Sequence, residues 1–181
     1  MKTFLCIILL LSVGNLLSQV PPLATLGSDI VDAEKRIFHM KGVNWWGANG
    51  SQYPYDESHS KGINTHAMPF GIHVQQIDTI VAAIKKAGFN TLRLPFSNQL
   101  IHDTTKAKKE WIGPNFFLLG KTPLEVLDEV IARFSDAGIC ILLNNHSTTT
   151  HWCCNFDYNG LWHGKNKFYD QTTDMWISDW V

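Results

Sequence analysis

The stretch TPLEVLDEVIARFSDAGICILLNNH, residues 122–146, decides the fold class of this chain. Thr122, Pro123 and Glu125 mark a helix start, because they supply an N-cap, a proline in the first turn and the acidic partner of a capping box. Apolar residues then recur at helical spacing and predict one buried face, formed by Leu124, Leu127, Val130, Ile131 and Phe134. Gly138 ends the helix. Residues 139–145 predict a strand that is apolar until its last two positions, as in a parallel strand covered by helices.

The same pattern occurs upstream. Residues 73–87 predict a helix followed by a glycine stop, with one apolar face formed by Val74, Ile77, Ile80, Val81, Ile84 and Ala87. Strands are predicted at 37–46 and 90–95, with long loops at 48–71, 96–121 and 146–171. A further helix is expected to begin near Thr172. The alternation predicts an α/β fold with a parallel sheet.

Polar residues lie at the carboxyl ends of the predicted strands. In such folds the catalytic and ligand-binding residues are usually found at these ends. Arg93 lies between two leucines, so strand alternation directs its guanidinium to the side of the sheet away from the helices. A guanidinium there needs a carboxylate or a solvated pocket, and we weigh a structural ion pair against a catalytic positioning role. Asn144, Asn145 and His146 form a polar group at the carboxyl end of the third predicted strand, which indicates site residues, and a purely structural role is the alternative for His146.

The loop after that strand is rich in aromatic residues, histidine and cysteine. Trp152 and Trp162 are candidates for stacking on sugar rings, although the same residues would also serve in packing. Cys153 and Cys154 are disulfide candidates, with a partner expected outside this chain, since neighbouring cysteines bridge each other only with strain. A zinc site is the other interpretation of this loop, but its spacing matches no standard ligand pattern. We expect no metal.

Composition excludes several classes of protein. The 181 residues are 45% hydrophobic and 17% charged with a net charge of −1, which excludes a disordered chain and a polybasic nucleic-acid binder. Residues 4–13 form an apolar run that is too short to span a bilayer and matches a secretory signal peptide. An uncleaved anchor or a buried strand is the alternative. We expect a signal peptide at 1–18, a leader at 19–34 and a secreted protein with no membrane association after cleavage.

Three ordered segments resemble glycoside hydrolase family 5, the cellulase-like group of clan A: Gly42 to Gly47, Gly88 to Ser97 and Leu142 to His146. The resemblance covers about residues 35–181 and implies a (β/α)8 barrel, of which this chain would hold the first three βα units. It implies a retaining glycosidase acting on cellulose, β-glucan or mannan, monomeric at full length and without a cofactor. Arg93 and His146 match supporting catalytic positions. Trp45 or Trp46 would be sugar platforms, and Asn145 would contact substrate.

One departure from the family is large. A retaining glycosidase needs two carboxyl groups about 5–5.5 Å apart. In this family both are glutamates at strand ends, the first of them within Asn-Glu-Pro. This sequence has no Asn-Glu pair, and none of its five glutamates stands at a predicted strand end. We therefore expect residues 35–181 to be the amino-terminal part of a longer barrel domain, and the 181-residue chain alone to be inactive.

Two other functions remain open from the sequence. A non-catalytic carbohydrate-binding or decoy protein would keep the aromatic platforms without the carboxylates, and would bind insoluble cellulose without hydrolysing it. A secreted zinc-binding module would use the histidines and cysteines of the 146–171 loop.

Overall fold

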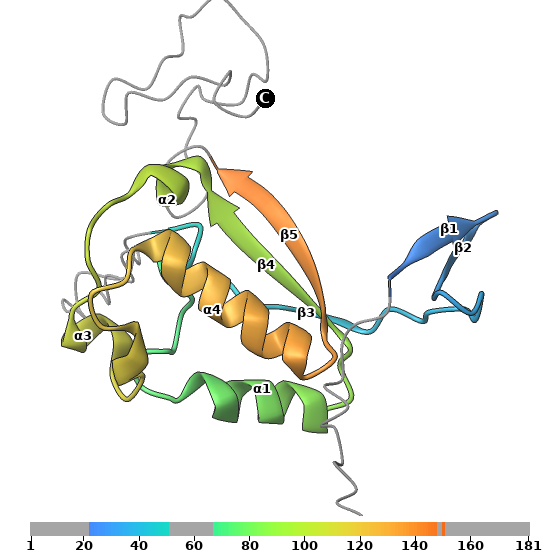
Figure 1. The fold of residues 1–181 in the computed structure, drawn as a ribbon, viewed down its shortest axis with the longest axis horizontal. Coiled ribbons are helices and arrows are strands. Elements are labelled where there is room, and N and C mark those ends of the chain that lie inside the picture. The colour runs from blue at the N-terminus through green and yellow to red at the C-terminus, as the bar shows by residue number, and fades with distance from the viewer. Residues whose placement is uncertain (1–21, 51–66, 148–149, 151–181) are drawn as a thin grey trace, which may run out of the picture.

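Three parallel strands form the central sheet, in the order β3-β4-β5. The computed structural model describes residues 22–50, 67–147 and 150. Within them β3 spans Gly42–Asn44, β4 spans Thr91–Ser97 and β5 spans Cys140–Ser147. The predicted alternation of strand and helix and the parallel sheet are confirmed for this part of the chain (Figure 1). The helix expected near Thr172 lies outside the described residues.

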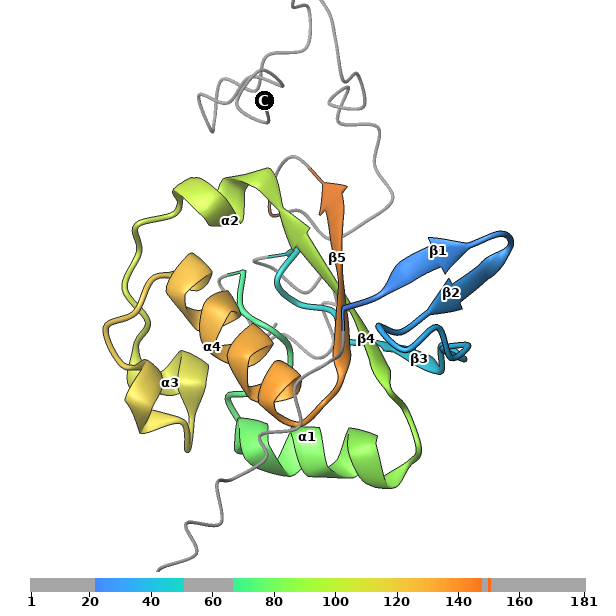
Figure 2. The same cartoon turned by 45° about the vertical axis from the view of Figure 1, so that its right-hand side comes forward.

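The amino-terminal region differs from the prediction. A hairpin of β1 (Ala24–Leu26) and β2 (Asp29–Val31) stands in what was expected to be a leader. The strand expected at 37–46 is wrong in extent, because only Gly42–Asn44 pairs with β4, while Ile37 forms an antiparallel bridge to Val31. Figures 1 and 2 both show the hairpin on the side of the sheet away from the helices.

Two helices cover the other face of the sheet (Figure 1). Helix α4 spans Pro123–Asp136, and its predicted capping box is confirmed: Thr122 and Glu125 exchange hydrogen bonds between side chain and backbone. Helix α1 spans Ile77–Lys86, four residues shorter at its start than expected. Val74 is therefore not on the buried face; it precedes the helix and is 70% exposed.

Short helices occupy the segment predicted as the loop 96–121. Helix α2 (Asn98–His102) follows β4 directly, and α3 (Lys109–Ile112) and the 3-10 helix η2 (Phe116–Leu118) precede α4. Each contributes one apolar side chain to the interior, namely Leu100, Ile112 and Leu118, all with no exposed surface. Elements of three to five residues carry too few turns to show helical periodicity, so the sequence pattern does not reveal them.

The core lies between the sheet and the two long helices. Leu92 and Leu94 of β4 are fully buried there, and they meet Ile77 and Val81 of α1 and a stripe of α4 formed by Val126, Leu127, Val130 and Phe134. Removal of such side chains from water supplies about 1.5–3 kcal/mol each. By contrast, Leu142 and Leu143 of β5 are 40% and 53% exposed. They lie on opposite faces of the outermost strand of the described sheet, so neither face of β5 is fully covered there.

A buried asparagine fixes the start of α1. Asn115, 1% exposed, accepts a hydrogen bond from Ile77 N at 2.9 Å, in place of the missing side-chain cap at Gln76. Its Nδ2 lies 2.7 Å from the carbonyl oxygen of Ile72 and 2.9 Å from that of Gln75. One side chain thus satisfies backbone groups at the entry to α1 that burial would otherwise leave unpaired.

Replacement of this asparagine tests that role. Asn115→Leu preserves volume but removes every polar partner, and each buried backbone group left unpaired costs about 1–3 kcal/mol. We expect the free energy of unfolding, measured by urea denaturation of the full-length protein, to fall by at least about 2 kcal/mol. The exposed Gln75→Leu is the control and should change it by no more than about 0.5 kcal/mol. Equal losses in the two variants would contradict the assignment.

Gly47, just after β3, lets this part of the chain come into close contact with residues 68–70. Gly47 has φ +121°, and a Cβ there would lie 2.3 Å from Phe70 N and 2.7 Å from Met68 O. Gly71 also has a positive φ, +94°, but open space surrounds it. Gly47 therefore meets two requirements, a backbone conformation and a close approach, whereas Gly71 meets only the first.

The two glycines form a matched pair of variants. Gly71→Ala should cost about 1–2 kcal/mol through backbone strain alone. Gly47→Ala should cost about 1–3 kcal/mol more, because backbone atoms must move to admit the methyl group. Thermal and urea unfolding of the two variants measure the difference, and an equal loss of stability would show that the approach of residues 68–70 to Gly47 is not tight.

Candidate active site

Three polar side chains from three strands meet on the face of the sheet away from the helices. The register sets Asn44 of β3 beside Arg93 of β4. Arg93 Nη2 donates to Asn144 Oδ1 of β5 at 2.6 Å, and Nη1 lies 3.4 Å from Asn44 Oδ1. Leu92 and Leu94 on either side of Arg93 are buried against the helices, so the predicted orientation of the guanidinium is confirmed.

The partners of Arg93 are neutral. Within the described part of the chain no carboxylate contacts its guanidinium, which is half-buried between two amide oxygens. The structural ion pair considered from the sequence is therefore not formed by these residues. An amide oxygen satisfies a donor but leaves the positive charge uncompensated, so Arg93 presents a net cation to this face of the sheet.

His146 joins the same group through Asn144. Its Nδ1 lies 3.2 Å from Asn144 Oδ1, and its side chain is exposed. The sequence places Asn144 in the polar strand end but predicts a specific role only for Asn145 and His146. Strand alternation puts Asn144 on the same face of β5 as His146, and the register shows that this is the face that pairs with the Arg93 side of β4.

Asn145 lies apart from this group. It pairs in register with Phe96, which packs against the core, so it faces the helix side of the sheet. Its Oδ1 is buried and has no hydrogen-bond partner among the residues that the structure describes. The structure therefore does not bring Asn145 together with Arg93 and His146.

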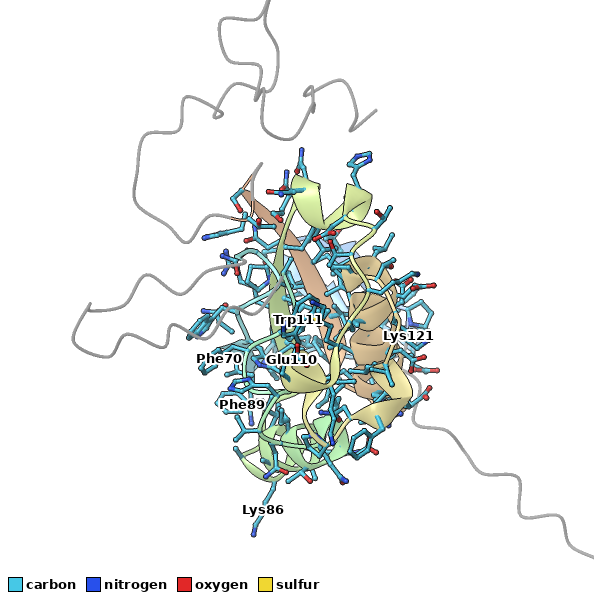
Figure 3. The ribbon with its side chains drawn as sticks, turned by 90° about the vertical axis from the view of Figure 1, so that its left-hand side faces the viewer. Phe70, Lys86, Phe89, Glu110, Trp111 and Lys121 are labelled. Carbon is cyan, nitrogen blue, oxygen red and sulfur yellow. The ribbon has the colours of Figure 1, made fainter. Side chains whose placement is uncertain are left out.

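The two tryptophans after β3 have different surroundings. Trp45 is 9% exposed, its ring lies 5.5 Å from that of Phe134, and its Nε1 donates to Phe70 O at 2.6 Å. This is a packing role, so we keep the prediction of a sugar platform for Trp46 alone. Trp46 is partly exposed and stacks on Phe70 with ring centroids 4.7 Å apart. Figure 3 shows Phe70 at one side of the fold and Lys121, just before α4, at the other.

The loops that follow the strands are joined to one another. Ser147 Oγ, at the end of β5, donates to Asn49 O in the turn after β3 at 3.2 Å. Gln99 Oε1, just after β4, accepts from Thr150 N and Thr150 Oγ1 at 2.9 and 3.0 Å. These bonds link the ends of all three strands and so help to hold the edge at which Arg93, Asn144 and His146 meet.

Four of the five glutamates fall within the described residues, and none of these four forms an ion pair with Arg93. Glu125 belongs to the capping box, where the backbone N–H of Thr122 lowers the pKa of its carboxyl below the ordinary value. Glu110 lies on α3, well away from the ends of β4 and β5 (Figure 3). Glu34 and Glu129 form surface ion pairs with Arg36 and Lys121. Each therefore has a structural or surface role.

Several predicted residues cannot be placed. Trp152, Trp162, Cys153 and Cys154 lie outside the described residues, so neither their stacking nor their disulfides are tested. The described ranges hold no group of three histidine, cysteine or acidic side chains that could bind a metal ion. Cys140 is a free thiol at the start of β5, and burial raises its pKa. Within the described ranges, no helix has the length and apolar character needed to cross a membrane.

Comparison with known proteins identifies the fold and the family. The catalytic domain of the major endoglucanase from Xanthomonas campestris pv. campestris matches with a TM-score of 0.57 and 25% identity, over 77% of this chain and 36% of that one. An endocellulase from Pyrococcus horikoshii, solved with cellotetraose, matches with a TM-score of 0.55 and 23% identity, over 74% of this chain and 34% of that one. These neighbours are (β/α)8 barrels, which confirms the prediction of a partial barrel.

Sequence comparison agrees. An endoglucanase from Paenibacillus polymyxa is 27% identical over 86% of this chain and 34% of its own length. The major extracellular endoglucanase of Xanthomonas campestris pv. campestris is 26% identical over 83% of this chain and 26% of its own length. The chain thus spans about a quarter to a third of these relatives. The family model described as cellulase (glycosyl hydrolase family 5) matches residues 41–179, most of the chain, and the protein therefore belongs to that family.

Proposed function

We propose that the full-length protein carrying this chain is a secreted retaining glycosidase that hydrolyses the β-glycosidic bonds of a polysaccharide such as cellulose, β-glucan or mannan. Family membership and the endoglucanase relatives support a glycosidase acting on polysaccharides. The apolar run at residues 4–13 and the name of the extracellular relative support secretion. We propose a monomer whose partner is the glycan itself.

The observation that carries the proposal is the guanidinium of Arg93, held by two amides and not neutralised by a carboxylate among the described residues. In a retaining mechanism one carboxylate attacks the anomeric carbon while a second carboxyl group protonates the leaving oxygen, and water then hydrolyses the glycosyl-enzyme. The nucleophile must be ionised. A cation within hydrogen-bonding reach favours that ionised form, and two N–H groups on one plane would also orient it.

We propose that both carboxyl groups come from other parts of the full-length protein, because no carboxylate among the described residues forms an ion pair with Arg93, and Glu34, Glu125 and Glu129 are engaged elsewhere. Arg93 is then a positioning residue for the nucleophile. His146 belongs to the same hydrogen-bond group, and Trp46 is the proposed sugar platform after β3.

Substitution of Arg93 in the full-length protein tests this role. Arg93→Ala should lower kcat on carboxymethyl-cellulose or mannan by about a hundredfold or more, the size of effect seen when one preorganised electrostatic contact is removed. Affinity for the glycan should change by much less. Arg36→Ala, at an exposed turn before β3, is the matched control and should leave both quantities unchanged. Equal losses of kcat and binding in Arg93→Ala would indicate a structural arginine.

The 181-residue chain alone provides a second test. Because the described residues bring no carboxylate pair to Arg93, we expect the 181-residue chain to release no reducing sugar from β-glucan or mannan, while the full-length protein does. Turnover by the isolated chain would contradict the proposal. Retention on insoluble cellulose by a full-length protein that does not hydrolyse it would favour a non-catalytic carbohydrate-binding function instead.

A further inference from the structure

One oxygen atom lies between the two supporting side chains of the site. Asn144 Oδ1 is 2.6 Å from Arg93 Nη2 and 3.2 Å from His146 Nδ1. The Asn144 side chain is anchored from its other end as well, because its Nδ2 donates to Asn145 O at 3.3 Å. Its position on β5, two residues before His146, places all three groups on one face of the sheet.

The chemistry of arginine decides which way the amide of Asn144 points. A guanidinium carries only N–H donors, so the atom that faces it at 2.6 Å must be the acceptor, the amide oxygen. The reversed amide would place an NH₂ group against N–H donors. The orientation is therefore set by Arg93 and does not depend on His146.

The same oxygen then decides the state of the imidazole. Oδ1 is an acceptor, so Nδ1 of His146 forms a hydrogen bond with it only by carrying the proton. A neutral imidazole holds one ring proton, and a proton on Nδ1 leaves Nε2 as a lone-pair acceptor. We propose that Asn144 is a positioning residue that holds neutral His146 in the Nδ1–H tautomer and presents Nε2 as an acceptor at the open face of the site.

The Nδ1–H tautomer determines which chemical groups can bind to His146. The side chain is exposed, so Nε2 is accessible to a group that donates a hydrogen bond. If the proposed function holds, that group is a hydroxyl of the bound sugar; a carbonyl or carboxylate oxygen has no proton to give to Nε2. The tautomer itself rests only on Arg93, Asn144 and His146 and does not require that the protein hydrolyse glycans.

Nitrogen NMR of the full-length protein labelled with ¹⁵N-histidine tests the tautomer directly. The spectrum is taken at a pH where histidine is neutral, and the His146 signals are assigned by their loss in His146→Gln. We expect a pyrrole-type shift for Nδ1 and a pyridine-type shift for Nε2. A pyridine-type Nδ1 in the wild-type protein would overturn the proposal.

Two variants of Asn144 separate the acceptor from the shape of the side chain. Asn144→Leu keeps the size but removes the acceptor, and the Nε2–H tautomer that free histidine prefers should return. Asn144→Asp keeps an oxygen acceptor and should keep Nδ1–H. Asn145→Leu makes the same change at the neighbouring position, whose side chain has no bond to His146, and should leave the tautomer unchanged. An unchanged tautomer in a folded Asn144→Leu protein would also overturn the proposal.

Kinetics on the same variants distinguish this inference from the proposed function. In an active enzyme, Asn144→Leu should raise KM for a soluble glycan by about tenfold, the cost of one lost hydrogen bond to substrate, and Asn144→Asp should largely restore it. A protein with the expected tautomer but no turnover would refute the glycosidase and leave the role of Asn144 intact. An unchanged KM in Asn144→Leu would show that Nε2 does not receive a substrate hydroxyl.

Discussion

The site depends on one constraint: a permanently charged guanidinium stands on the inner face of a parallel sheet and must be held there without a carboxylate from the strands beside it. Desolvation of the Arg93 guanidinium is costly unless its donors form hydrogen bonds. Asn44 and Asn144 supply amide oxygens from the two neighbouring strands. The register of β3, β4 and β5 is therefore tied to the chemistry of the site, because a slip of one residue would turn these amides to the helix face.

The helix side of the sheet makes that arrangement possible. Leu92 and Leu94 are fully buried on either side of Arg93, so they fix the orientation of the strand that carries it. Asn115 holds the start of α1, and the capping box holds the start of α4. Both helices are thereby fixed at their amino ends, and their apolar faces hold β4 in place. A rigid strand is what allows a flexible arginine side chain to act as a positioning group.

The fold was predictable where local chemistry is strong. The N-cap, proline and glycine around α4, and the apolar periodicity of α1 and α4, each carry a physical signal that tertiary structure did not override. The hairpin β1–β2 was missed because nearly all of its residues are exposed, so it has no buried face to produce an alternating pattern. Val74 matched the helical period by chance, and Asn115 places the helix start three residues later.

The site was predictable only where a local sequence pattern indicates the position or orientation of a side chain. Arg93 between two leucines is a local signal of orientation, and His146 stands at the end of an apolar run. Alternation places Asn144 on the same face as His146, but whether that face is the Arg93 side depends on strand register, which local sequence does not give. The pairing of Phe96 with Asn145 assigns Asn145 to the helix side and leaves Asn144 facing Arg93. The burial of Trp45 is likewise a tertiary property, since it arises from Phe134, 89 residues further along the chain.

The neutrality of Asn144 has a consequence for the electrostatics of the site. A carboxylate at that position would accept the same two hydrogen bonds but would neutralise Arg93, and it would compete with any further acid for the cation. An amide accepts the hydrogen bond and leaves the positive charge of Arg93 uncompensated, so Arg93 would favour the ionised form of the nucleophile in the proposed site. In the proposed tautomer the amide oxygen also accepts the hydrogen bond from His146 Nδ1. The strand end thus separates two tasks, since hydrogen bonding sets the positions of the groups and the unneutralised cation sets the preference for a negative partner.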